Sequence, residues 1–516
     1  MDDRYYENHK LREVGTKRDL MFALPFLLFS ILTVEFYSHA GAGLAASLAS
    51  IGLYLTGVVY IFPHRARCSR YGTVCMTLYI ACALSMIFSD DVFGKLCVCF
   101  AMVVLLPLTL MELMPLRSGR VGTLRAVSDW WNVAVRLSFG NIGAVLYAIF
   151  HREADGTVEK RRIGSVLIGL LCAVPALIVI VPLLTSADVA FGNLLGSVTL
   201  DGGAETLKTL FYGVILFLLL FGQHFAARFA CPPSRQSAGE KKGIDPMAVV
   251  SFLSVIAFVY VLYLVSQLAY FFSAFSGLLP SDFTVAQYAR RGFFEMVLLC
   301  VINLAIVTVV LRKVRKTEDR EPLSIRLFAL FFCGFSLLLI ATALSKMFLY
   351  IDSFGMTRLR ILTSVFMVFL AVVFCVAALW LFFRRIAYLK VALLTAVILI
   401  TLTGFADLDR VVARYNVEAY LSGELDTVDM QALANLSSDS VVPYVWELTR
   451  DEDATVSEQA YAILLDKLVE HGLAEVTFQG TRLLQTGYDW RAYSVPEYEA
   501  FCLLREHAEE IILANP

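Results

Sequence analysis

Long apolar segments recur along the whole chain and set its organisation. Eleven of them have roughly the 18–25 residues that a helix needs to cross the hydrocarbon core of a bilayer. Backbone polar groups in lipid must find partners within the segment, so each run predicts a helix. The expected spans cover residues 20–37, 43–62, 71–88, 96–113, 163–184, 207–227, 248–272, 292–311, 325–350, 361–383 and 387–406.

Polarity and composition point to the same class of protein. The run at 71–88 is short and rich in Cys, Ser and Thr, so the pattern leaves open whether it crosses completely. Alternating ten-residue segments, which are typical of a membrane barrel, are not found in the sequence. The chain is 58% hydrophobic and 17% charged, with a mean hydropathy of +0.70. A soluble globular chain is about half apolar and about a quarter charged. We therefore expect an all-α, polytopic transmembrane helix bundle.

The chain ends are polar and frame this bundle. Residues 1–19 form a charged N-terminal segment, 20–406 form the bundle, and 407–516 are expected to form a soluble helical domain. Thr455 with Glu458, and Ser494 with Glu497, have the spacing of helix capping boxes. Gly472 follows a run of helical periodicity, where a C-terminal glycine belongs. The pattern predicts helices in this domain and no strand.

The distribution of charge predicts the orientation. With the N-terminus in the cytoplasm, the inner segments hold 29 Lys and Arg and the outer segments hold six. Basic residues favour the cytoplasmic side, so this topology is the expected one. An odd number of spans then places the C-terminal domain on the outer side of the membrane. We expect that membrane to be a bacterial plasma membrane. That domain carries 21 Asp and Glu against seven Lys and Arg, a balance that an anionic cytoplasmic leaflet would repel.

One long connection between spans contains a helical pattern of its own. Asp129-Trp130-Trp131 opens an amphipathic stretch near 126–150, which is too short in apolar length to cross the membrane. Adjacent Trp residues with basic flanks are typical of a helix that lies in the membrane interface. The alternative is a buried or re-entrant packing helix.

Signatures of soluble enzymes are not found in the sequence. It has no Walker-type phosphate loop, no Gly-x-Ser-x-Gly elbow and no His-x-x-x-His pair, and its seven His are scattered. Most of the 11 Cys lie inside apolar runs and lack the paired spacing of metal ligands. We expect no metal, no cofactor and no nucleic-acid partner, and we do not favour an enzyme.

Polar side chains inside the seventh expected span form one candidate site. Tyr260, Tyr263, Gln267 and Tyr270 follow increments of three, four and three residues, so they share one stripe of the helix. Polar residues are costly in lipid and usually face the interior of a bundle. The stripe is consistent with a polar cavity. It is equally explained by hydrogen bonds that join neighbouring helices.

Charged residues at the outer ends of several spans form the second candidate. They are Asp188, Asp282, Glu295 and Asp352, together with Arg290, Arg291, Lys346, Arg358 and Arg360. Glu295 and Lys346 lie deepest, and opposite charges near hydrocarbon lower each other's cost when they pair. We expect these two to pair in an outward-facing site for an anionic or zwitterionic ligand, or around a titrating carboxylate. The alternative is a structural ion-pair network with snorkelling Lys and Arg stems.

Short motifs from residue 186 onward carry a resemblance to a known family. They are Ser186-Ala187-Asp188, residues 288–295, Tyr350-Ile351-Asp352, residues 355–360, Ala413-Arg414-Tyr415-Asn416 and Leu436-Ser437-Ser438-Asp439. From about 186 to 442 the chain is similar to a bacterial membrane family described only as domain-of-unknown-function family 4173, of the 4153-like type. The first two hundred residues resemble it in hydropathy alone. The resemblance implies a membrane protein and supplies no activity.

The sequence favours two functions and leaves a metal-free membrane enzyme open as a third. One is transport or ligand binding within an outward-facing polar cavity, with a small solute or a lipid as the ligand. The other is a membrane sensor or scaffold whose outer acidic domain binds a ligand or a protein partner. In both, the lipid bilayer is the principal surrounding partner.

Overall fold

The computed structural model describes residues 17–39, 41–63, 69–114, 116, 124–145, 203–228, 243–276, 293–315, 321–383, 386–477, 480–484 and 486–515. The chain divides into two compact units. Unit 1 comprises Met1–Arg235 and the short segment Gly487–Tyr498, and unit 2 comprises Gln236–Thr486 and Glu499–Pro516. The C-terminal region therefore contributes residues to both units.

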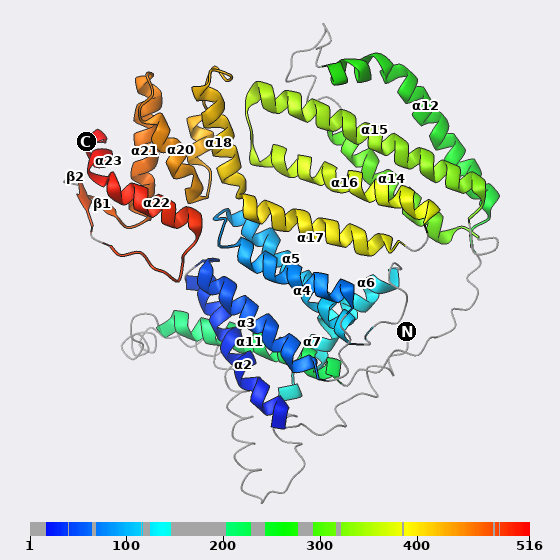
Figure 1. The fold of residues 1–516 in the computed structure, drawn as a ribbon, viewed down its shortest axis with the longest axis horizontal. Helices are drawn as coiled ribbons and strands as arrows, with labels where there is room; N and C mark the ends of the chain where they lie inside the picture. Colours follow the sequence, from blue (N-terminus) through cyan, green and yellow to red (C-terminus); the bar gives the residue numbers. More distant parts are fainter. Residues whose placement is uncertain are drawn as a thin grey trace, which may run out of the picture. The chain divides into compact units, whose positions relative to one another are not determined.

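Unit 1 is built from long apolar helices and one short broken helix (Figure 1). Its elements are α2 (Lys17–His39), α3 (Leu44–Ile61), α4 (Arg70–Ser85), α5 (Val92–Leu113), α6 (Leu124–Trp131), the π-helix η1 (Asn132–Arg136), α7 (Leu137–Gly140) and α11 (Gly203–Arg228). Helix α2 packs against α3 and α11, and α4 packs against α5. Aromatic rings of Phe26, Tyr60 and Phe221 fill the space between α2, α3 and α11.

Unit 2 contains a second group of long helices and most of the C-terminal domain. The long helices are α12 (Pro246–Ser276), α14 (Phe293–Lys313), α15 (Leu323–Phe354), α16 (Arg358–Phe382) and α17 (Tyr388–Ala406). Helix α15 packs against α12, α14 and α16, so it lies at the centre of this group. Its buried side chains include Phe332, Cys333 and Leu339. They form one apolar core with the neighbouring helices.

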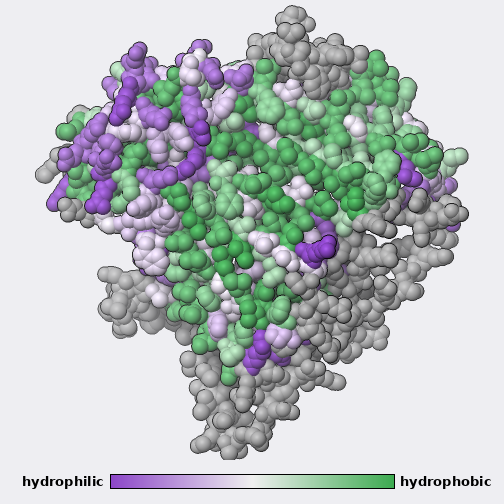
Figure 2. All heavy atoms as spheres, in the orientation of Figure 1, coloured by the Kyte–Doolittle hydropathy of each residue, from purple (hydrophilic) through white to green (hydrophobic). Residues whose placement is uncertain are grey.

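The membrane helices match the hydropathy pattern closely. Nine helices of the described chain are long and apolar enough to cross a bilayer, and each corresponds to one of the eleven expected spans. The run at 71–88 forms α4, a helix of 16 residues, which falls short of that length. The run at 163–184 lies outside the described residues. Large side chains such as Phe258, Val265 and Phe348 are exposed on these helices, and apolar surface of this extent needs lipid (Figure 2).

The expected interfacial helix takes the form of α6, η1 and α7. Its buried side carries Asp129, Asn132 and Val133, and the Val133 carbonyl accepts a hydrogen bond of 2.8 Å from Gln223 Nε2 of α11. Trp131 is exposed on the other side. The described segment thus packs against its neighbours, as the packing alternative requires, and still presents an apolar face. Its position in the membrane interface stays a prediction.

The C-terminal domain is mostly helical, and its surface is markedly hydrophilic (Figure 2). Its elements are α18 (Leu408–Leu421), α19 (Met430–Ala434), the 3-10 helix η2 (Asp439–Val441), α20 (Val442–Leu448), α21 (Ala454–Glu470), β1 (Ala474–Thr477), β2 (Gly480–Leu483), α22 (Val495–Glu506) and α23 (Ala508–Ala514). The antiparallel hairpin β1–β2 pairs Ala474 with Leu483. The expectation of no strand was wrong, because strands of four residues are too short to show alternation.

Two of the three predicted helix ends in this domain are correct. Ser494 caps α22, since its Oγ accepts a hydrogen bond of 3.4 Å from Glu497 N. Gly472 follows the end of α21 with a φ of +64°, a conformation that glycine adopts without strain. Thr455 does not cap α21. The cap is Asp453, whose carboxylate accepts a hydrogen bond of 2.9 Å from Thr455 N.

Candidate functional site

The tyrosine stripe of α12 joins a closed group of uncharged polar side chains. Tyr260 Oη donates a hydrogen bond of 2.6 Å to Asn303 Oδ1 of α14. Asn303 Nδ2 donates one of 3.0 Å to Ser336 Oγ of α15. All three side chains are buried, and the Tyr260 ring stacks on Phe335 at 4.2 Å. For Tyr260 this is the interhelical hydrogen bonding that was the alternative to a cavity.

The other members of the stripe give less information. Tyr263 is half-buried, and its ring meets Phe335 edge to face at 6.2 Å. Gln267 and Tyr270 belong to α12, but their side chains lie outside the described residues. The cavity along this stripe stays a prediction.

The charged residues expected at the outer ends of the spans separate into three groups. Asp188, Asp282, Arg290 and Arg291 lie outside the described residues. Glu295 is exposed in the first turn of α14, Lys346 is half-buried in α15, and Asp352 is exposed near the end of α15. Arg358 and Arg360 begin α16 and contact other partners, as set out below.

The expected ion pair between Glu295 and Lys346 stays a prediction. Glu295 is exposed, and an acidic residue in the first turn of a helix is stabilised by the helix dipole. Glu295 therefore needs a basic partner less than its predicted position near the hydrocarbon suggested. The wider network of charges stays a prediction.

Arg360 holds the turn between α15 and α16. Its Nη1 donates hydrogen bonds to the carbonyls of Phe354, at 2.9 Å, and of Gly355. Its guanidinium lies 4.1 Å from the centre of the Tyr350 ring. The same turn is fastened to α18, because Met356 N donates to Asn416 Oδ1 at 2.6 Å and Asn416 Nδ2 donates to the Met356 carbonyl at 2.9 Å.

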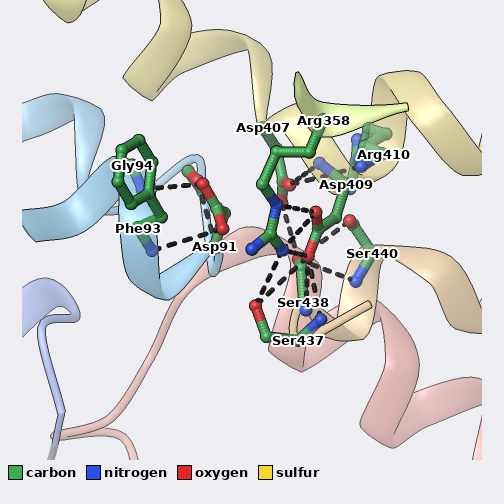
Figure 3. A network of polar contacts seen from close by, with 11 residues as sticks. Asp91, Phe93, Gly94, Arg358, Asp407, Asp409, Arg410, Ser437, Ser438 and Ser440 are labelled. Carbon is green, nitrogen blue, oxygen red and sulfur yellow. Dashed lines mark hydrogen bonds and ion pairs between the residues drawn. The ribbon is translucent and has the colours of Figure 1, made fainter. Parts of the chain in front are cut away.

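Arg358 links a membrane helix to the C-terminal domain through an ion pair. Its Nε donates to Asp409 Oδ1 at 2.9 Å, and its Nη2 lies 2.5 and 2.6 Å from the two carboxylate oxygens (Figure 3). Asp409, in the first turn of α18, is completely buried, whereas the Arg358 side chain is 30% exposed. Charge-assisted contacts of this multiplicity are among the strong hydrogen bonds of proteins.

Backbone amides complete the shell around Asp409. Its Oδ2 accepts hydrogen bonds from Ser437 N at 2.9 Å and Ser438 N at 3.0 Å. Ser438 Oγ in turn donates to Asp407 Oδ2 at 2.8 Å. Asp407 caps α18 by accepting from the amides of Asp409 and Arg410, and it does so with a φ of +49° (Figure 3). We call Arg358, Asp407, Asp409, Ser437 and Ser438 the junction network.

A second charged cluster follows directly in the sequence. Asp439 Oδ1 lies 2.9 Å from Lys467 Nζ, and its Oδ2 lies 3.0 Å from His471 Nε2. Burial disfavours the charged carboxylate, but the contacts with His471 and Lys467 outweigh that effect and lower the pKa of Asp439 below its usual value. This cluster ties η2 to α21. The turn at 437–441 is therefore held by α18 and Arg358 on one side and by α21 on the other.

The segment Gly487–Tyr498, which we call the strap, packs on the helix ends of unit 1. Leu44 N donates to the Tyr493 carbonyl at 2.8 Å, and Val495 N donates to the Ile87 carbonyl at 2.7 Å. Gly43 permits this approach, because a Cβ at that position would lie 2.8 Å from the Tyr493 oxygen. The strap thus meets the α2–α3 connection and the end of α4.

A buried ion pair lies elsewhere in unit 1. Asp19 in the first turn of α2 pairs with Arg228 in the last turn of α11. Tyr60 Oη of α3 also donates to Asp19 Oδ1, at 2.7 Å. The two charged side chains are 0% and 4% exposed. Three helices therefore share one sealed charge cluster.

Sequence reasoning missed most of these partners. Arg358 was a candidate, but Asp407 and Asp409 were counted only as part of an acidic domain. The signal was present in the two Asp residues that follow the last apolar run and in the Ser437-Ser438-Asp439 motif. As for metals, the described residues contain no group of three or more His, Cys, Asp or Glu that could hold an ion.

The nine candidate spans of the described residues, the exposed apolar surface and the polar domain together define a multi-pass membrane protein with a helical bundle. Residues 24–445 match the family described as Domain of unknown function (DUF4153), and the chain belongs to that family. This confirms the 4153-like resemblance. It also extends the resemblance to most of the first two hundred residues, where hydropathy alone had suggested it. No curated protein and no solved structure matches the chain.

Proposed function

We propose that this protein is a membrane sensor or scaffold, in which the acidic C-terminal domain receives a ligand or protein partner and transmits the event to the helix bundle. The junction network carries the proposal. Asp409 of the domain is completely buried and is bound by Arg358 of a membrane helix. A domain that served only as an appendage would need no such contact with a span.

The connection between membrane helix and domain is short as well as charged. Helix α17 ends at Ala406 and α18 begins at Leu408, so only Asp407 separates them. Met356 and Asn416 add a reciprocal pair of hydrogen bonds between the α15–α16 turn and α18. A displacement of α18 would therefore pull directly on the ends of α15, α16 and α17.

The strap supports the same proposal from unit 1. It comes from the C-terminal region of the chain, yet its backbone hydrogen bonds are to Leu44 and Ile87 at helix ends of unit 1. The strap runs into α22 without a break, because α22 starts at Val495. The C-terminal region is thus attached by structured contacts to membrane helices of both units.

The proposal includes the orientation expected from the basic residues, with the C-terminal domain outside a bacterial plasma membrane. The turn at 355–357 and the start of α3 at Leu44 both belong to the predicted outer side, and both contact the C-terminal region. Protease added to intact spheroplasts should remove a C-terminal tag and spare an N-terminal tag. A C-terminal tag that survives until lysis would contradict this orientation.

Transport through an outward-facing cavity has less support. Tyr260 is satisfied within a closed trio of uncharged side chains. The sensor proposal rests instead on contacts that are described atom by atom.

Hydrogen–deuterium exchange of the full-length protein in lipid nanodiscs tests the coupling. Arg358→Gln should raise amide exchange both in α18 with residues 437–441 and in the membrane-helix ends near 350–362, because one contact holds both. Arg414→Gln is the matched control, since Arg414 forms only an exposed pair with Glu418 on the same helix α18. If Arg358→Gln raised amide exchange only in the C-terminal domain, the helix bundle would not respond to changes in that domain. The proposal would then fail.

A further inference from the structure

The strap carries an exposed tryptophan at the ends of membrane helices. Trp490 is 64% exposed, three residues before Tyr493, whose carbonyl accepts the Leu44 amide. The rings of Tyr488, Tyr493 and Tyr498 contact one another and give the strap a packed aromatic base. Trp490 lies outside these ring contacts with most of its surface uncovered.

The hydrogen bonds of the strap fix its position relative to the ends of the membrane helices. Leu44 is the first residue of α3, and Ile87 lies five residues before Val92, where α5 begins; both α3 and α5 are long enough to cross a bilayer. A helix that spans the bilayer ends where hydrocarbon gives way to headgroups. Apolar side chains next to these ends are exposed as lipid-facing residues would be, namely Leu48, Phe88, Val92, Phe93 and Leu96. The strap therefore lies at the boundary layer of unit 1.

We propose that the strap is a bilayer anchor, with the Trp490 indole inserted at the headgroup–acyl boundary beside the helix ends of unit 1. Tryptophan is enriched at this depth, because its ring is apolar and its N–H can reach headgroup or water oxygens. The apolar surface of Leu48 and Phe88 is continuous with hydrocarbon on the bundle side. A lipid partner accounts for an exposed indole on a segment that is otherwise hydrogen-bonded in place.

The charges beside Trp490 indicate which lipids it meets. Arg491 follows it directly but pairs with Asp489, with Nη2 3.0 Å from Oδ2. The tip of the strap thus presents one positive and one negative charge, which leaves it without net attraction for anionic headgroups. The anchor should therefore insert equally into zwitterionic and anionic membranes, through the indole rather than through charge.

Fluorine NMR of the full-length protein in nanodiscs tests this anchor. The chain has five Trp, so 5-fluorotryptophan labelling gives a small set of resonances, and Trp490→Phe identifies the one from the strap. Trp490→Tyr provides the same assignment if the first variant fails to fold. Nanodiscs of phosphatidylcholine are then doped with a headgroup-nitroxide lipid, and a water-soluble paramagnetic chelate is added to a separate sample.

The expected result is loss of the Trp490 resonance with the nitroxide lipid and its retention with the chelate. Replacement of part of the phosphatidylcholine by phosphatidylglycerol should leave this result unchanged. Trp446 is the internal control, since its ring stacks on His507 within the C-terminal domain and should not respond to the nitroxide lipid. A Trp490 resonance broadened by the chelate alone, or by neither agent, would overturn the proposal, because the indole would then lie in water or under protein.

Discussion

Two buried ion pairs, one in each unit, are built from the same chemistry in different settings. Asp19 and Arg228 of unit 1 are 0% and 4% exposed, and both lie at helix ends where the dipole favours their charge. In unit 2, Asp409 is equally buried, but Arg358 is 30% exposed. Arg358 also begins its helix, where a positive charge is unfavourable.

This difference distinguishes a fixed contact from one that can be released. Arg228 and Asp19 are both buried, so neither side of the unit 1 pair faces water. Arg358 is partly exposed, so one side of the unit 2 pair can be reached by water. Asp409 itself would keep the amides of Ser437 and Ser438. The junction can therefore exchange partners at a moderate free-energy cost, as the proposed sensor function requires.

The largest expected effect is in the sealed pair. Asp19→Asn should lower the free energy of unfolding in detergent by about 3–5 kcal/mol, because it removes the charged partner of a buried Arg228 side chain. The double variant Asp19→Asn with Arg228→Met should recover part of this loss. Chemical denaturation followed by fluorescence measures both.

Lys208→Gln supplies the control for that experiment. Lys208 lies on the same helix α11 as Arg228 but forms an exposed pair with Glu205. Its loss should change stability very little. A double variant that is less stable than Asp19→Asn alone would show that the two charges do not depend on each other.

A smaller effect is expected at the junction. Arg358→Met should lower the free energy of unfolding by about 1–3 kcal/mol, the usual range when a charged group loses its hydrogen-bond partner. The loss is limited because Asp409 keeps two backbone donors. The same denaturation measurement applies, with Arg414→Met on α18 as the control. An effect as large as that of Asp19→Asn would remove the distinction between the two pairs.

Acid should act on the C-terminal side of the junction. The pKa of Asp439 is lowered in the folded protein from its ordinary value of 3.8. Its charged form therefore stabilises the fold above that value, and the contribution is lost as pH falls through the lower folded-state pKa. Asp439→Asn should reduce stability at neutral pH and flatten the acid side of the stability profile.

The alkaline side of the same profile is set by Lys467. Its pKa is raised above 10.5 despite burial, chiefly by Asp439. Its stabilising effect is complete below that value and is lost as pH rises through the higher folded-state pKa. Thermal unfolding at a series of pH values measures both sides. An unchanged acid limb in Asp439→Asn would show that another group controls it.

The smallest effect is expected from the uncharged trio. Tyr260→Phe keeps the ring that stacks on Phe335 and removes only the hydroxyl that binds Asn303. The cost should be about 1 kcal/mol or less, as for other hydrogen bonds between membrane helices. A loss comparable to that of Arg358→Met would mean that Tyr260 has a further role, which would revive the cavity hypothesis.

The sequence predicted which segments cross the membrane far better than it predicted which side chains contact each other. Hydropathy located nine of the spans, because lipid imposes a length and a polarity that composition reveals directly. It placed Arg358 at a span end, but it suggested charges of neighbouring segments as its partners. The actual partner, Asp409, is 51 positions away and is brought back by the turn from α17 to α18. Helical periodicity gives no information on such tertiary pairing.

The single residue between α17 and α18 also limits how the chain can be rearranged. One inserted residue at Asp407 would change the length and path of this connection, which would move Asp409 away from Arg358. The C-terminal domain therefore cannot be exchanged for another domain at this boundary. Domains joined by flexible linkers can be exchanged. The family match runs through the boundary and ends at 445. Fusions and grafts that preserve the joint should accordingly be made beyond that position, with α18 and the Ser437-Ser438 turn kept together with the bundle.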